Sequence, residues 1–159
     1  MKKILKSKAL RYVLTVLWCV VIFLFSANDA DTSSEQSDVI TDICIDTFVP
    51  DYDSLSGAEQ EDIFDTVSFM VRKTAHFTEY LILGALIFWC LHRAGDKRVR
   101  TACSAVGASL YSVTDELHQL FSDGRSCELR DVLIDSGGGL LGAFLGLLIL
   151  VIYEKKKVK

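Results

Sequence analysis

The chain has 159 residues, of which 50% are hydrophobic, 17 are Lys or Arg, 21 are Asp or Glu and one is Pro. This length fits a single domain. The apolar content and the net charge of −4 exclude a disordered chain, a disulfide-bonded miniprotein and a nucleic-acid binder with a basic face. The hydrophobic residues are gathered in four blocks, with the charged residues between them, which favours a membrane protein.

The four apolar blocks are each long enough to approach the roughly 20 residues with which a helix crosses the bilayer core. Only helices and closed barrels satisfy the backbone there. No block shows the period-two alternation of a barrel strand. We therefore expect an all-α membrane protein with four transmembrane helices, at about residues 11–27, 73–91, 101–121 and 132–153.

The first block also has features of a cleaved signal peptide, because Lys-rich residues precede it and Ser26-Ala27 could serve as a cleavage site. Its length favours a retained helix, since the apolar run is long for a signal peptide. Arg11 can extend the span further by reaching the interface with its charged end.

An acidic segment, residues 28–68, joins the first two spans and contains twelve Asp or Glu and no Lys or Arg. Apolar residues recur at helical spacing from Val39 to Thr47, which predicts a short amphipathic helix over about 33–48. A turn at Pro50 ends it, and a second helix is expected to start near Ser56 and run into the second span. We expect a helical cap on the bundle; the alternative is an interfacial helix dipping into the outer leaflet.

The distribution of Lys and Arg predicts the orientation of the spans. Thirteen lie in the amino terminus, the 93–100 loop and the carboxyl tail, and four lie in the intervening segments. Basic residues favour the cytoplasmic side. Both termini are therefore expected in the cytoplasm and the acidic segment outside, in a multi-pass protein of the cell membrane.

Ionisable residues inside apolar spans are costly and tend to be functional. Three such clusters fall near the predicted outer ends of the second, third and fourth spans. Their members are Arg72, Lys73, His76, Glu79 and Tyr80; Asp115, Glu116, His118 and Gln119; and Arg125, Arg130, Asp131 and Asp135. At 1.5 Å per residue, the members within the spans lie within about 10 Å of the outer boundary and can meet in one pocket.

Structural alternatives exist for each cluster. Asp131 and Asp135 can stabilise the amino-terminal dipole of the fourth helix, Arg72 can anchor a helix at the interface, and the whole network can be interhelical hydrogen bonding. A divalent metal held by His76 and His118 is a weaker alternative. No metal or cofactor is expected.

Small residues in the fourth span provide a further packing signal. Gly138, Gly142 and Gly146 form a ridge that allows close approach of another helix, either inside the bundle or at a homodimer seam. The five cysteines show no metal-binding spacing, and Cys44 and Cys127 could pair because both are predicted to lie outside.

The three clusters together resemble a known family, the VanZ-like proteins, which are small bacterial membrane proteins named for a teicoplanin-resistance determinant. The resemblance covers roughly residues 10–150. It rests on Arg72-Lys73-x-x-His76-x-x-x-Tyr80, Asp115-Glu116-x-His118-Gln119-x-Phe121-x-x-x-Arg125 and Asp131-x-x-x-Asp135-x-x-Gly138. Asp135, where Asn is expected, and Ser122-Asp123-Gly124, where a Pro-containing turn is expected, depart from the pattern. The resemblance implies one VanZ-like domain over 1–159, a cell-envelope role and, in some members, glycopeptide resistance, without an agreed mechanism.

Three functions fit these residues. The preferred one is binding of an anionic lipid or lipid-linked cell-wall precursor, without nucleic acid, through Arg72, Lys73, Tyr80, Glu116, Gln119, Arg125, Asp131 and Asp135. The second is an envelope enzyme in which His118 or His76 acts with Asp115 as an acid–base pair. The third is a purely structural network in an accessory subunit. A transporter is disfavoured because the inner halves of the spans lack polar residues.

Overall fold

The computed structural model describes residues 8–27, 30–92, 95–119, 121 and 128–158, without the side chains of 30–36 and 158. This part of the chain is helical and contains no strand, which confirms the all-α class. The elements are α1 (Lys8–Ser26), α2 (Ala30–Phe48), the 3-10 turn η1 (Tyr52–Ser54), α3 (Gly57–Cys90), α4 (Lys97–Gln119) and α5 (Leu129–Val158).

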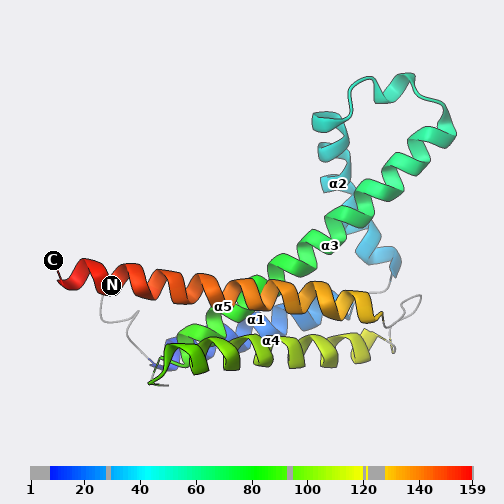
Figure 1. Cartoon of the computed structure of the whole chain (residues 1–159). Helices are drawn as coiled ribbons and strands as arrows, with labels where there is room; N and C mark the ends of the chain where they lie inside the picture. The colour runs from blue at the N-terminus through cyan, green and yellow to red at the C-terminus, as the bar shows by residue number, and fades with distance from the viewer. Residues whose placement is uncertain (1–7, 28–29, 93–94, 120, 122–127, 159) are drawn as a thin grey trace.

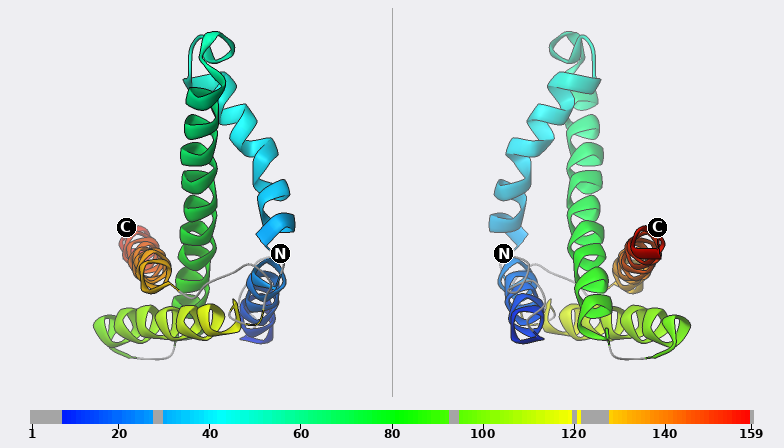
Figure 2. Two further views of the ribbon diagram at one scale, coloured as in Figure 1. Left: turned by 90° about the vertical axis from the view of Figure 1, so that its right-hand side faces the viewer. Right: turned by 90° about the vertical axis from the view of Figure 1, so that its left-hand side faces the viewer.

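A bundle is formed by α1, α4, α5 and the carboxyl-terminal half of α3, and α2 lies with the other half of α3 as a projecting arm (Figure 1; Figure 2). The beginning of α1, the end of α3, the beginning of α4 and the end of α5 lie at one end of the bundle. The end of α1, the end of α4 and the beginning of α5 lie at the other end. Residues far apart in sequence therefore meet at each end.

The length of α3 explains the arm. The helix begins with a capping box, in which the Glu59 backbone N–H donates to Ser56 Oγ at 3.4 Å and the Ser56 N–H donates to Glu59 Oε2 at 3.0 Å. No Pro or Gly interrupts it before Gly84. Its 34 residues span about 51 Å, more than a bilayer core requires.

The predicted outer helix is present as α2, and the predicted second helix runs without a break into the bundle as α3. The position of α2 differs from the expected cap, because α2 packs against the amino-terminal half of α3. Its buried residues are Ser37, Thr41 and Ile45, which recur at intervals of four on one face of the helix. The connection is held by Tyr52, whose hydroxyl donates to Gln60 O at 2.9 Å.

Glycines bring α5 close to α3. A Cβ at Gly142 would lie 1.9 Å from the Leu81 carbonyl oxygen, and one at Gly138 would lie 2.2 Å from the Phe77 carbonyl oxygen. The glycine ridge therefore packs against α3 inside the bundle, which was one of the two alternatives predicted from the sequence. Association of two chains through it stays a prediction. The predicted Cys44–Cys127 pair involves Cys127, which lies outside the described residues.

Two helices of the described chain are long and apolar enough to cross a membrane by length and composition, α1 and the segment Leu129–Lys157. Most of the apolar side chains of α1 face outward from the bundle. Such an outward apolar surface requires a cover in water, whereas lipid tails satisfy it without one.

Candidate functional site

Seven polar residues gather where the end of α1, the end of α4 and the beginning of α5 meet α3. We call this group the carboxylate end. None of these residues is more than 5% exposed. They are Ser26, Tyr80, Ser112, Asp115, Glu116, Gln119 and Asp135.

Asp135 and Tyr80 connect α5 and α3 at the centre of this group. Ser112 of α4 donates to Asp135 Oδ2 at 3.1 Å, and the Tyr80 hydroxyl faces Asp115 and Asp135. Asp135 Oδ1 is buried and makes no hydrogen bond within the described part of the chain. The site thus holds carboxyl groups with some hydrogen-bonding capacity in reserve.

Asp115 has neighbours from three helices. The Gln119 amide donates to Asp115 Oδ2 over a long 3.5 Å, and the hydroxyl groups of Ser26 and Tyr80 face the same carboxyl group. Because Gln119 is one helical turn after Asp115, both side chains occupy the same face of α4. Of the five residues predicted to meet, the structure brings Tyr80, Asp115 and Asp135 together, and their role as a site stays a prediction.

Glu116 has a specific contact with the beginning of α5. Its Oε2 accepts the Glu128 backbone N–H at 3.1 Å, although the side chain belongs to α4. The first backbone N–H groups of a helix have no intrahelical partner, so a carboxylate there stabilises the helix start. This contact gives Glu116 a helix-capping role in addition to its predicted place in the pocket.

Lys73 and Asp131 connect α3 to the first turn of α5. The Lys73 ammonium donates to both carboxylate oxygens of Asp131 at 2.6 Å, and the two side chains are 21% and 16% exposed. Arg130 pairs with Glu128 at 3.0 Å. Lys73 and Arg130 also lie 5.3 Å and 4.8 Å from the Phe69 ring centroid, within the range of cation–π attraction.

The two histidines predicted as acid–base candidates have different neighbours. His76 Nδ1 lies 3.8 Å from Glu79 Oε2, and the His118 ring lies 4.5 Å from the Phe23 ring. His118 acts electrostatically on Asp115, but no hydrogen bond or ion pair joins the two among the residues described.

The structure describes one of the two remaining arginines that the sequence placed in the pocket. Arg72 is partly buried, and its Nε makes no hydrogen bond within the described ranges. Arg125 lies outside the described residues, so its place in the pocket stays a prediction. In the described part of the chain, no three His, Cys, Asp or Glu residues are arranged to hold a metal ion.

Two serines of the carboxylate end are absent from the predicted set. Ser112 lies one turn before Asp115 and continues a stripe of small residues with Ser104 and Ala108 at intervals of four. That stripe is a detectable signal of close helix packing. The sequence marks Ser26 only as part of a candidate cleavage site, and nothing in it indicates that Ser26 meets Asp115.

A family model described as VanZ/LLP1 matches the chain over residues 11–151. The matched region covers all the described residues of the carboxylate end. Comparisons with curated proteins and with solved structures found no match.

Proposed function

Because the chain belongs to the VanZ/LLP1 family, we propose that it is a bacterial cell-membrane protein that binds an anionic lipid or a lipid-linked cell-wall precursor at the outer leaflet. Membership of this family indicates a membrane protein linked to glycopeptide resistance. In the proposal, residues 1–159 form one VanZ-like domain, four helices cross the membrane, and occupation of the site changes tolerance to teicoplanin-type glycopeptides.

The burial pattern of α4 supports a membrane span despite its many polar residues. Its buried residues include Ser104, Ser112 and Asp115, whereas Val106 and Leu110 are exposed. A soluble helix shows the opposite pattern, with apolar residues inside. An apolar exterior around a polar interior is expected where lipid surrounds the helix.

The charge distribution supports the orientation. One end of the bundle, where α1 begins and α5 ends, carries basic residues such as Lys8 and Lys155. The arm carries acidic residues. Basic residues favour the cytoplasmic side. We therefore place both termini in the cytoplasm and the carboxylate end at the outer leaflet.

A pocket of about 460 Å³ beside the carboxylate end carries the binding proposal. Lys73 and Arg130 line it together with an apolar wall, which is formed by Phe69, Met70, Phe77 and Ile134. Two cations beside hydrocarbon match an amphiphile with an anionic head and an apolar chain. The Arg130–Glu128 pair is exposed at the surface and contributes only about 0–1 kcal/mol, so a phosphate can compete for Arg130.

Binding is favoured over catalysis by the contacts of His118. General acid–base chemistry requires a positioned imidazole, as a rule held by a carboxylate through a hydrogen bond. His118 packs on Phe23 instead, and the described residues provide it with no such hydrogen bond. Binding in the pocket does not involve His118, because this residue is not in the lining of the pocket.

The proposal is tested with a short-chain polyprenyl phosphate as the probe, titrated into the purified protein in detergent. We expect saturable binding that the uncharged polyprenol does not reproduce, and about three- to tenfold weaker binding for Arg130→Gln. Arg98→Gln, an exposed change at the opposite end, is the matched control and should bind as the native protein does. Equal binding of polyprenol and polyprenyl phosphate would reject an anion-binding site.

The cellular test measures teicoplanin tolerance in a sensitive bacterial host that expresses the chain. Native protein and Arg98→Gln should raise tolerance alike, and Arg130→Gln should raise it less at the same membrane level. Full tolerance with Arg130→Gln would separate the resistance role from this pocket.

A further inference from the structure

Two buried arginines lie at the other end of the bundle, far from the pocket proposed above. Arg11 of α1 is 8% exposed and Arg100 of α4 is 6% exposed. Arg11 Nη1 donates to the Trp89 carbonyl oxygen at 3.4 Å, and Arg100 Nε donates to the Phe88 carbonyl oxygen at 2.5 Å. We call this group, together with Tyr153, the arginine end.

Aromatic rings supply the other contacts of the two guanidinium groups. Arg100 lies 3.8 Å from the Phe88 ring centroid, and Arg11 lies 5.4 Å from the Trp89 ring centroid. Cation–π attraction and a carbonyl contact orient a guanidinium but do not neutralise it.

Neither arginine has an acidic partner within ion-pair distance in the described part of the chain. Glu154 is the acidic group that acts on Arg100, and its carboxylate is already in an ion pair with Lys97. Arg11 Nε is buried without a hydrogen-bond partner among the described residues. Two neighbouring buried cations of this kind require an anion, because burial of an unpaired charge is costly.

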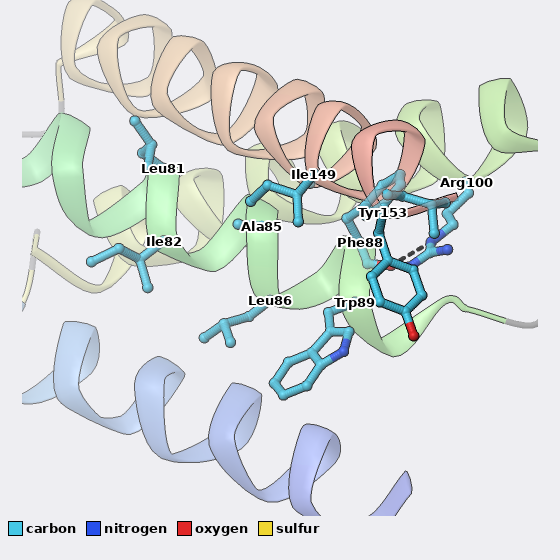
Figure 3. A pocket seen from close by; sticks show the side chains of 11 residues that line it. Leu81, Ile82, Ala85, Leu86, Phe88, Trp89, Arg100, Ile149 and Tyr153 are labelled. Carbon is cyan, nitrogen blue, oxygen red and sulfur yellow. Dashed lines mark hydrogen bonds between the residues drawn. The ribbon is translucent and has the colours of Figure 1, made fainter. Parts of the chain in front are cut away.

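An apolar pocket of about 480 Å³ between α3 and α5 has Arg100 in its lining, together with Trp89, the residue that Arg11 contacts. Figure 3 shows aliphatic side chains along its length, and Trp89, Tyr153 and Arg100 gathered toward one end. From Leu81 to Trp89 the pocket follows α3 for about 12 Å of helix axis. Its wall is therefore hydrocarbon along most of its length and cationic at its end.

We infer that the arginine end binds an anionic phospholipid, with the phosphate on Arg11 and Arg100 and one acyl chain in the pocket between α3 and α5. A soluble phosphate would leave the apolar length of the pocket unused, and a zwitterionic lipid would bring its own cation to the arginines. In the proposed orientation this lipid belongs to the cytoplasmic leaflet, where anionic head groups attract basic residues. The inference depends on different residues from the proposed glycopeptide-related site.

The test uses Trp89 as a reporter, because the chain has two tryptophans and Trp18→Phe leaves Trp89 alone. This variant is placed in phosphatidylcholine vesicles that contain a fraction of acyl-brominated lipid, whose bromine quenches tryptophan fluorescence on contact. Brominated phosphatidylglycerol should quench Trp89 at about tenfold lower mole fraction than brominated phosphatidylcholine. Equal quenching by the two lipids would overturn the inference, whatever the variants below do.

Two further variants locate the effect. Arg11→Gln and Arg100→Gln, each in the Trp18→Phe background, should bring the two quenching curves together, whereas exposed Arg98→Gln should leave them apart. Circular dichroism checks that each variant is folded. If Arg100→Gln is unfolded, the result for Arg11→Gln decides the test. Loss of the preference on addition of inorganic phosphate, but not of chloride at equal ionic strength, would show that the site favours soluble phosphate and would overturn the inference.

Discussion

The two ends of the bundle bury ionisable groups in different ways. At the carboxylate end, side chains from different helices contact one another, as in Ser112 with Asp135, and Lys73 pairs with Asp131 beside it. At the arginine end, Arg11 and Arg100 contact carbonyl groups and aromatic rings, with no acid of their own among the described residues. The comparison teaches that the buried carboxyl groups have hydrogen-bond donors of the chain beside them, whereas the buried arginines have no acid of the described chain beside them, and this second arrangement is the reason for inferring a bound anion.

The largest expected effect concerns neither end of the bundle but the close contact between α3 and α5 along the glycine ridge. In Gly142→Val, the Cβ would overlap the Leu81 carbonyl oxygen and force the helices apart. We expect a loss of about 3 kcal/mol or more of stability, measured by thermal or denaturant unfolding in detergent. Gly57→Ala is the control, since a Cβ there meets nothing within 4 Å. Unchanged stability of Gly142→Val would contradict the close packing of the ridge.

The next prediction concerns pairing inside the carboxylate end. Asp135→Leu removes the acceptor for Ser112 and leaves that buried hydroxyl unsatisfied, at a cost of about 2 kcal/mol. Asp135→Asn keeps an acceptor oxygen and should cost less than about 1 kcal/mol. The same unfolding measurement compares the two variants. If both cost the same, the negative charge of Asp135, rather than its hydrogen bond, determines stability.

A smaller effect distinguishes ion pairs at the two ends. Lys73–Asp131 is partly buried, whereas Lys97–Glu154 is 44% and 48% exposed. Double-mutant cycles with alanine should give a coupling energy of about 1 kcal/mol or more for the first pair and about 0–0.5 kcal/mol for the second. Equal couplings would remove this distinction between the ends.

The smallest effect belongs to the start of α3, outside both ends. Hydrogen bonds from the side chain and backbone of Ser56 lower the pKa of Glu59 below its ordinary value. The contribution of ionised Glu59 is therefore present above its ordinary pKa in the unfolded chain and is lost as the pH falls through its lowered pKa. Amide hydrogen exchange at residues 57–60 should accelerate over this acidic range relative to the intrinsic rate. Glu59→Gln should abolish that pH dependence, and its persistence would exclude Glu59 as the source.

Hydrophobic patterning was sufficient to predict the helices, because α1, α4 and α5 correspond to the apolar blocks at 11–27, 101–121 and 132–153. Patterning did not predict the projecting arm. The position of α2 depends on the stiffness of uninterrupted α3, which a local pattern does not convey.

The candidate site was predictable where polar residues stand out against apolar spans, as Tyr80, Asp115 and Asp135 do. Arg11 and Arg100 were less visible, because basic residues at span ends are ordinary topology signals. Their burial depends on the tertiary positions of Phe88 and Trp89. Residue spacing alone also did not predict that Glu116 reaches across to cap α5.

The proposed placement of the two ends on opposite faces of a membrane is tested most directly by cysteine labelling of intact cells. Single cysteines replace Ser54 in the arm, Asp96 beside α4 or Lys155 at the end of α5, in a chain whose native cysteines are changed to alanine. A membrane-impermeant maleimide should label position 54 in intact cells and positions 96 and 155 only after permeabilisation. Labelling of positions 54 and 155 from the same side would contradict the proposed four-span bundle.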